Sequence, residues 1–243
     1  MNMRALVTGV NSVVNRVLLA KLLEMGYEVT AQYHSDNELT KSLKAQCVDR
    51  KVVFIQADLS SKEGFLSFVE KSMDKKYDVV VNGAVFYSEK VDSSPQLDFD
   101  AWQKSFAVNT TTPGVLMAHG DRMMNENSVI VNISSTFGQI YMGDIQMAMY
   151  SASKAALDLL TTTYAKRWSK NKIRVVGIAP GYMKSSWNLD YDREQIKNLT
   201  DKQLNDEIVD PKEIASLLET IIENKGFNGT TIVIDAGVSA PII

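Results

Sequence analysis

The sequence of 243 residues contains few of the side chains from which metal sites and disulfides are built. Cys47 is the only cysteine, which excludes an intrachain disulfide and fits a reducing cytoplasm. The only histidines, His34 and His119, lie far apart in the sequence. A metal site rich in cysteine or histidine is therefore not expected.

The charge balance and the apolar runs argue against two further classes of protein. The 26 basic and 29 acidic residues give a formal net charge of −3, which leaves no basic footprint for nucleic acid. No apolar run is long enough to span a membrane, and the first residues lack the pattern of a secretion signal. We therefore expect a cytoplasmic protein without a membrane or nucleic-acid partner.

Short apolar runs alternate with amphipathic stretches along the chain, which predicts strands followed by helices. The predicted strands are Arg4–Thr8, Tyr27–Tyr33, Val52–Gln56, Asp78–Asn82, Val129–Ser134, Arg174–Ala179 and Thr231–Ile234. The predicted helices are Val13–Met25, Asn37–Cys47, Lys62–Asp74, Phe99–Met124, Met149–Ser169 and Pro211–Glu223, with a break in the fourth at Pro113-Gly114. The strands are rich in Val and Ile without polar alternation, as in strands covered on both faces. We therefore predict one α/β domain over residues 1–243, with a Rossmann-like, doubly wound parallel sheet of about seven strands.

Tyr150 and Lys154 are the most informative pair of residues, because a spacing of four places them on one face of a predicted helix. A lysine cation there stabilises the phenolate and lowers the pKa of the tyrosine, which makes it a usable proton donor and acceptor. Ser135 follows the end of a predicted strand just upstream. Taken alone, the pair is better explained by an ordinary helix with an exposed lysine.

Ligands of parallel sheets bind beyond the carboxyl ends of the strands, so the loops there are candidate cofactor sites. In the first loop Gly9 allows a tight turn, and the following helix N-terminus offers N–H groups to a phosphate. The second strand ends at Tyr33 without the acid that usually binds the ribose hydroxyls of NAD, which favours NADP, with His34 or Ser35 placed to meet its 2′-phosphate. Asp36 is better explained as a helix cap.

The motifs and their order resemble those of the short-chain dehydrogenase/reductase family over nearly all of the chain. Thr8-Gly9 resembles the start of its Thr-Gly-x-x-x-Gly-x-Gly loop, Asn82-Gly83-Ala84 its Asn-Asn-Ala-Gly segment, and Pro180-Gly181 with Ser185 its Pro-Gly-x-x-x-Thr loop. The resemblance implies a catalytic set of Asn109, Ser135, Tyr150 and Lys154. It also implies a cofactor-binding set of Gly9, Asn11, Ser12, Val14, His34, Ser35, Asp58, Leu59, Asn82, Gly83, Ala84, Tyr150, Lys154, Pro180, Gly181, Met183 and Ser185.

The resemblance implies hydride transfer between a nicotinamide cofactor and a small-molecule carbonyl or alcohol. Tyr150 would exchange the proton with the substrate oxygen, and Ser135 would hydrogen-bond the same oxygen. Lys154 would lower the pKa of Tyr150 and hold the nicotinamide ribose, while Asn109 would orient a water that links Lys154 to solvent. The implied cofactor is NADP, with NAD as the alternative.

Two departures from the family pattern bear on cofactor binding. The second and third glycines of the loop are replaced by Val13 and Asn15, and the Asn-Asn-Ala-Gly segment carries Gly83 and Val85 at its second and fourth positions. A branched side chain at 13 would crowd the pyrophosphate, so glycine at both loop positions should tighten NADPH binding. The departures leave two alternatives to an enzyme: a dinucleotide-sensing protein with little turnover, and an interaction protein with a vestigial cleft. The retained catalytic residues favour the enzyme.

Substrate contacts and assembly are expected from two further regions. A substrate loop is predicted near residues 185–208, where Trp187, Leu189 and Tyr191 either wall an apolar substrate or pin the loop to the body. Tyr141, Met142 and Met147 are candidates for the opposite wall. The resemblance implies a homodimer or homotetramer, formed through the long helices that carry Asn109 and Tyr150.

Overall fold

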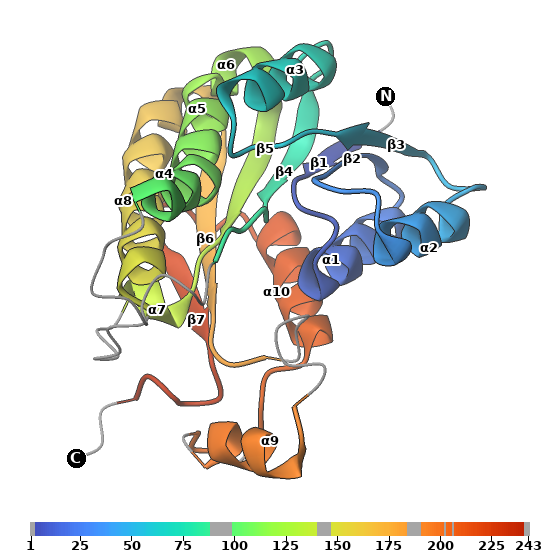
Figure 1. Ribbon diagram of the computed structural model, residues 1–243. Helices are drawn as coiled ribbons and strands as arrows, with labels where there is room; N and C mark the ends of the chain where they lie inside the picture. Colours follow the sequence, from blue (N-terminus) through green and yellow to red (C-terminus); the bar gives the residue numbers. More distant parts are fainter. Residues whose placement is uncertain are drawn as a thin grey trace.

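The centre of the fold is a parallel sheet that carries helices on both faces (Figure 1). The computed structural model describes residues 3–87, 99–139, 147–183, 191–201, 203–205 and 207–240. Its strands are β1 (Arg4–Val7), β2 (Glu28–Tyr33), β3 (Val52–Gln56), β4 (Tyr77–Asn82), β5 (Met124–Ile133), β6 (Arg174–Pro180) and β7 (Thr231–Ile234). They form a seven-stranded sheet in the order β3-β2-β1-β4-β5-β6-β7, and every neighbouring pair is parallel.

The helices divide between the two faces of the sheet. The α-helices are α1 (Val13–Glu24), α2 (Glu38–Gln46), α3 (Lys62–Ser72), α4 (Phe99–Phe106), α5 (Thr112–Ala118), α6 (Gly120–Met123), α7 (Thr136–Gln139), α8 (Ala148–Trp168), α9 (Arg193–Thr200) and α10 (Pro211–Glu223). Residues of α1, α2 and α10 share one apolar core with the sheet, and residues of α3, α5, α6 and α8 share the other. Within the described part of the chain, no helix combines the length and the apolar character needed to cross a bilayer.

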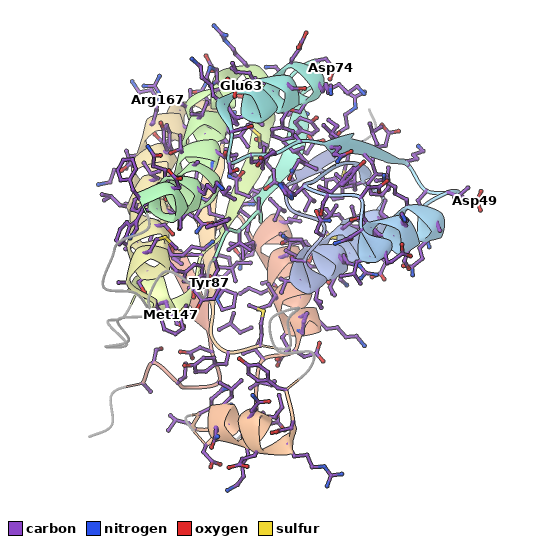
Figure 2. All side chains as sticks on the ribbon, in the orientation of Figure 1. Asp49, Glu63, Asp74, Tyr87, Met147 and Arg167 are labelled. Atoms are coloured by element: carbon purple, nitrogen blue, oxygen red, sulfur yellow. The ribbon has the colours of Figure 1, made fainter. Side chains whose placement is uncertain are left out.

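Alternation along the strands explains why both faces are covered. In β1, Leu6 points into the core under α3 and α8, whereas Ala5 and Val7 point into the core under α1 and α10. All three are fully buried, and burying a side chain of the size of Leu6 or Val7 contributes roughly 1.5–3 kcal/mol. Charged side chains such as Glu63, Asp74 and Arg167 instead point outward from the body (Figure 2). The predicted doubly wound parallel sheet is confirmed.

The predicted helix Phe99–Met124 is interrupted, as expected, but not at Pro113-Gly114. It is divided into α4, a π-helical turn at Ala107–Thr111, α5 and α6, and the chain leaves the helical path at His119. Pro113 does not break it, because it occupies the first turn of α5, where its missing N–H is not needed. The helices α7 and α9 were not predicted from the sequence.

The remaining predicted elements agree with the structure to within a few residues at their ends. The largest difference is in β5, which begins at Met124 rather than Val129. The prediction relied on a run of apolar residues, and the four residues before Val129 are polar. The predicted cap at Asp36 is wrong: the side chain of Asn37 accepts the N–H of Thr40 and caps α2. Asp36 instead pairs with Lys44, at 2.9 Å.

Candidate active site

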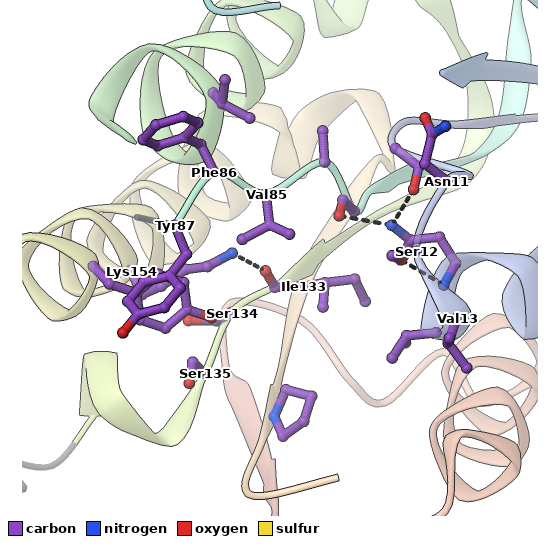
Figure 3. Close-up of a pocket in the computed structure, with 18 of the residues that line it drawn as sticks. Asn11, Ser12, Val13, Val85, Phe86, Tyr87, Ile133, Ser134, Ser135 and Lys154 are labelled. Carbon is purple, nitrogen blue, oxygen red and sulfur yellow. Dashed lines mark hydrogen bonds between the residues drawn. The ribbon is translucent and has the colours of Figure 1, made fainter. Parts of the chain in front are cut away.

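A cavity of about 780 Å³ opens at the carboxyl ends of the strands (Figure 3). Most of the site residues predicted from the sequence line it: Gly9, Asn11, Ser12, Val14, His34, Asp58, Leu59, Gly83, Ala84, Ser135, Tyr150, Lys154, Pro180, Gly181 and Met183. Asn82, Asn109 and Ser35 do not line it. Ser185, Trp187, Leu189, Tyr141 and Met142 lie outside the described residues.

The loop between β1 and α1 forms one end of the cavity. Gly9 has a φ of +75°, and a Cβ there would lie 2.5 Å from the Cα of Ala84, so only glycine fits this turn. The hydroxyl of Ser12 caps α1 by accepting the N–H of Asn15 at 3.1 Å. In the described part of the chain, no hydrogen bond uses the backbone N–H groups of Val13 and Val14. These N–H groups, at the positive end of the helix dipole, fit the pyrophosphate of a dinucleotide.

Asn15 stands where the family pattern has its third loop glycine, and its side chain joins the loop to β4. It is 1% exposed, and its Nδ2 donates to the carbonyl oxygens of Gly83 at 2.7 Å, Gly9 at 2.9 Å and Thr8 at 3.3 Å. The amide thus fixes the spacing between the ends of two adjacent strands. No local pattern in the sequence indicates this role.

Gly83 leaves the space in which the side chain of Asn15 lies. A Cβ on residue 83 would lie 2.3 Å from the Oδ1 of Asn15, so the buried amide fits only because residue 83 is glycine. The side chain of Asn15 therefore fills the space that a side chain at position 83 would need, so these two departures from the family pattern depend on each other. For Asn15 this reverses the expectation that glycine would improve the loop, because glycine would remove its hydrogen bonds. Val13 lines the cavity, so for that residue the expected crowding stands as a prediction.

Asn11 and Gln32 join the cofactor loop to the neighbouring strands β2 and β3. Asn11 donates to the carbonyl oxygen of Ser35 at 3.0 Å and accepts the N–H of His34 at 2.8 Å. Gln32, which is buried, accepts the N–H of Gly9 and donates to the carbonyl oxygen of Ala57, both at 2.8 Å. These amides shape the loop from within, so Asn11 acts here as a structural tie between segments.

His34 and Asp58 face each other at the same end of the cavity, with 3.6 Å between Nε2 of His34 and Oδ1 of Asp58. Burial acts to raise the pKa of Asp58, but hydrogen bonds from the hydroxyl and N–H of Ser60, with the charges of His34 and Lys104, outweigh it and lower that pKa. Asp58 therefore remains an acceptor for the hydroxyl or amino groups of a nucleoside.

The opposite end of the cavity brings together Ser135, Tyr150 and Lys154, as the sequence predicts. Ser135 follows β5, and the other two lie one turn apart on α8. The ammonium of Lys154 lies 5.7 Å from the ring centroid of Tyr150 and donates to the carbonyl oxygen of Ile133 at 2.7 Å, a bond drawn in Figure 3. All three side chains are buried.

The expected lowering of the pKa of Tyr150 is not what the structure shows. Burial raises the pKa of Tyr150 to about 12, with a hydrogen bond to Ser135 acting against the rise and the charge of Asp158 adding to it. Burial likewise lowers the pKa of Lys154 to about 8, against the attraction of Asp158. Removal from water penalises both charged forms and here outweighs the pairing expected from the i,i+4 spacing. Tyr150 is therefore held as a protonated donor.

Asn109 contacts α8 but does not line the cavity. It lies in the π-helical turn, fully buried, where its Oδ1 accepts the N–H of Phe86 at 2.8 Å and its Nδ2 donates to the carbonyl oxygen of Phe86 at 2.9 Å. Nδ2 also lies 3.0 Å from the hydroxyl of Ser153, which itself bonds the carbonyl oxygen of Tyr150. The side chain therefore positions the segment after β4 against the turn of α8 that carries Tyr150.

Asn82 faces the interior of the sheet. Its Nδ2 donates to Oδ1 of Asn132 on β5 at 2.8 Å, and Asn132 in turn donates to the hydroxyl of Thr161 on α8 at 2.8 Å. All three residues are buried, so this chain of hydrogen bonds ties β4 and β5 to the helix that carries Tyr150 and Lys154. Asn82 thus reaches the cavity only through its backbone neighbour Gly83.

Sequence reasoning missed several residues that line the cavity: Val85, Phe86, Tyr87, Phe137, Tyr182 and Leu199. The first three follow directly on the Asn82-Gly83-Ala84 segment, and Phe137 lies two residues after Ser135. For all of them except Leu199, which lies on α9, a position just beyond a predicted strand end was the available signal. In Figure 2, Tyr87 and Met147 lie at the same end of the molecule, near α7.

Comparison with known proteins shows the same fold and family. The family model for short chain dehydrogenase matches residues 3–196. Glucose 1-dehydrogenase 2 of Bacillus subtilis is 26% identical over 97% of this chain and 94% of its own length. The 3-hydroxyacyl-CoA dehydrogenase type-2 of Drosophila melanogaster is 30% identical over 96% of each chain. This protein belongs to the short-chain dehydrogenase family.

Two solved structures illustrate the likeness in three dimensions. A short chain dehydrogenase from Burkholderia cenocepacia in complex with NADP has a TM-score of 0.88, with 24% identity over 98% of both chains. A 4-hydroxyisoleucine dehydrogenase complexed with NADH has a TM-score of 0.87, with 26% identity over 99% of this chain and 100% of its own. The protein is an oxidoreductase that transfers hydride between a nicotinamide cofactor and a carbonyl or alcohol substrate.

Proposed function

We propose that Tyr150, Ser135 and Lys154 carry out the proton transfer of this reaction. The observation that carries the proposal is their convergence at one end of the cavity, with Tyr150 held protonated by burial. A bound nicotinamide cofactor supplies or removes the hydride. In the direction of reduction, Tyr150 donates its proton to the substrate oxygen, and the hydroxyl of Ser135 donates a hydrogen bond to the same oxygen.

Lys154 supports this step electrostatically. When Tyr150 has given up its proton, the phenolate is stabilised by the lysine cation on the same helical face. The ammonium also reaches toward the cavity, where a ribose hydroxyl would accept a hydrogen bond. The amide of Asn109 is engaged by protein groups, so we propose that this residue acts by positioning the turn of α8 that carries Tyr150.

Cofactor binding is tested directly by titration of the purified protein with NADPH and with NADH, followed by nicotinamide fluorescence. We expect both to bind, because Gly9, Asp58 and the N–H groups of Val13 and Val14 meet parts that the two cofactors share. If neither binds at millimolar concentration, the proposed use of this cavity is wrong.

We propose NADP as the preferred cofactor, supported by the absence of an acid at the end of β2 and by the presence of His34 in the cavity. His34→Asp should reverse the preference toward NADH, because a carboxylate repels the 2′-phosphate and binds the ribose hydroxyls. The ratio of the two dissociation constants, measured by isothermal titration for both proteins, checks this expectation; an unchanged ratio in His34→Asp would remove His34 from the proposal.

We also propose that the protein is a homodimer or homotetramer of the cytoplasm. Support comes from α8, where Ala152, Ala155 and Leu159 form an exposed stripe at helical spacing, Leu159 being 69% exposed. Small residues allow close helix approach, and an exposed apolar stripe favours burial in an interface. Light scattering should give at least twice the 27.0 kDa chain mass at micromolar concentration. Leu159→Glu should shift the particle toward the monomer, whereas Leu66→Glu on α3, also exposed, should not.

A further inference from the structure

Three aromatic side chains form a connected group with Tyr150, each from the chain segment that follows a different strand. Tyr87 follows β4, Phe137 follows β5, and Tyr182 follows β6. The ring centroid of Tyr87 lies 5.9 Å from that of Tyr150, that of Phe137 lies 6.4 Å from Tyr150, and Phe137 and Tyr182 are 6.2 Å apart. The interplanar angles are 78°, 69° and 80°, so each pair meets edge to face. All of these rings line the cavity.

Backbone hydrogen bonds fix these rings relative to the reacting groups. The amide of Asn109 holds both backbone groups of Phe86, the residue before Tyr87. The N–H of Phe137 donates to the hydroxyl oxygen of Ser135 at 3.3 Å, and the N–H of Gly138 donates to the carbonyl oxygen of Ser135 at 3.0 Å. A rigid aromatic wall binds a flat substrate with little loss of side-chain entropy.

Charge is distributed unequally along the cavity. Among the described residues that line it, the ionisable side chains form two groups. One consists of Lys154 and the tyrosines Tyr150, Tyr87, Tyr182 and Tyr191, and the other of His34, Asp58 and Lys104. His34 lies 3.6 Å from Asp58, and the charge of Lys104 acts on the pKa of Asp58, so all three belong to the nucleotide end. Met147, Met183 and Leu199 add apolar surface to the lining of the cavity, and none of His34, Asp58 and Lys104 lies at its catalytic end. A carboxylate or phosphate on the substrate would find no counter-ion there among these residues apart from Lys154.

We propose that the substrate is an uncharged ketone with a planar ring next to its carbonyl group, or the corresponding secondary alcohol. The inference rests on the proposed function and adds the substrate class to it. The ring would pack edge to face against Phe137 and Tyr182, with its carbonyl oxygen toward Tyr150 and Ser135. In reduction the carbonyl carbon gains the hydride, the oxygen gains the proton of Tyr150, and the cofactor is oxidised by two electrons.

A panel of ketones with matched shapes tests the charge and the ring separately. It comprises acetophenone, its anionic analogue 4-acetylbenzoate, its cationic analogue 4-acetyl-N,N,N-trimethylanilinium, and ringless 2-butanone, each with NADPH and with NADH. We expect kcat/KM for acetophenone to exceed that for either charged analogue by at least about tenfold, because a buried unpaired charge is strongly disfavoured. It should exceed that for 2-butanone by a similar factor, because the ring contacts are absent there.

The variant Phe137→Leu tests whether the rings provide this preference. It should lower kcat/KM for acetophenone about two- to tenfold, and by more than it lowers that for 2-butanone, since the ringless ketone has no aromatic contact to lose. Phe54→Leu is the matched control: Phe54 has a similar edge contact, 6.4 Å from Tyr33, but does not line the cavity. Equal or greater rates for a charged analogue, or an unchanged preference in Phe137→Leu, would overturn the substrate class while the oxidoreductase assignment stands. No turnover of any ketone, with reduced cofactor bound, would overturn the proposed proton-transfer site as well.

Discussion

Tyr150→Phe should reduce kcat for carbonyl reduction by about 10²–10⁴-fold, the usual contribution of a positioned general acid. The phenol is 6% exposed and held protonated by burial, so its loss removes the proton donor from a site that water enters poorly. The ring remains, and with it the edge-to-face contacts to Tyr87 and Phe137. The dissociation constant for NADPH and the thermal midpoint should therefore change little. An undiminished rate on any accepted ketone would refute the role of Tyr150.

Lys154→Ala should lose both turnover and cofactor affinity, because Lys154 is proposed both to stabilise the phenolate and to bind a ribose hydroxyl. The pKa of about 8 also predicts a pH dependence. A lysine whose pKa is lowered carries full charge below about 8 and loses it above, so kcat/KM for reduction should be constant at lower pH and fall as the pH rises through about 8. Tyr150, with its pKa near 12, remains protonated across this range and does not contribute to the fall. In Lys154→Ala the residual rate should lack this limb of the profile.

The fold was largely predictable because its signals are local. Parallel strands have a strong Val and Ile composition even at the edges of this sheet, as in Val52–Gln56 and Thr231–Ile234, whose bounds were predicted without error. The prediction failed where packing outweighs local pattern. The first residues of β5 are polar, and the π-helical turn at Ala107–Thr111 depends on contacts between Asn109 and Phe86 that no sequence window contains.

The candidate site also has features that the sequence predicted and features that it did not. Tyr150 and Lys154 were found because their spacing on one helix is itself the signal, and Gly9 because a turn next to a helix N-terminus requires it. The pKa values of Tyr150 and Lys154 were not predictable, because the burial of these side chains depends on the whole fold. Here the effect of burial outweighs the interaction between the two residues. The meaning of Asn15 was hidden for a related reason. Its partner Gly83 lies 68 residues away in the chain, and each residue taken alone looks like a defect of the family pattern.

Asn15 and Gly83 should therefore show strong energetic coupling. Asn15→Gly removes three hydrogen bonds and places glycine in the first turn of α1, so we expect a loss of roughly 3 kcal/mol in the free energy of unfolding. Gly83→Asn forces a Cβ to within 2.3 Å of the Asn15 amide, and overpacking of this kind costs roughly 1–3 kcal/mol. Both variants should also bind NADPH more weakly, because the loop that meets the pyrophosphate is displaced.

The double variant, Asn15→Gly with Gly83→Asn, restores the family's residues at both positions and should be more stable than the sum of the single losses predicts. Removing the Asn15 side chain opens the space that a side chain at position 83 needs, so we expect a coupling energy of at least about 1.5 kcal/mol in urea unfolding, with NADPH affinity recovering in parallel. As a control, Asn228→Gly, which loses a hydrogen bond to the N–H of Val175 on β6, should combine with Gly83→Asn additively to within about 0.5 kcal/mol. If the losses from Asn15→Gly and Gly83→Asn were also additive, the two positions would not be energetically coupled. The shape of the cofactor loop would then depend on Asn15 alone.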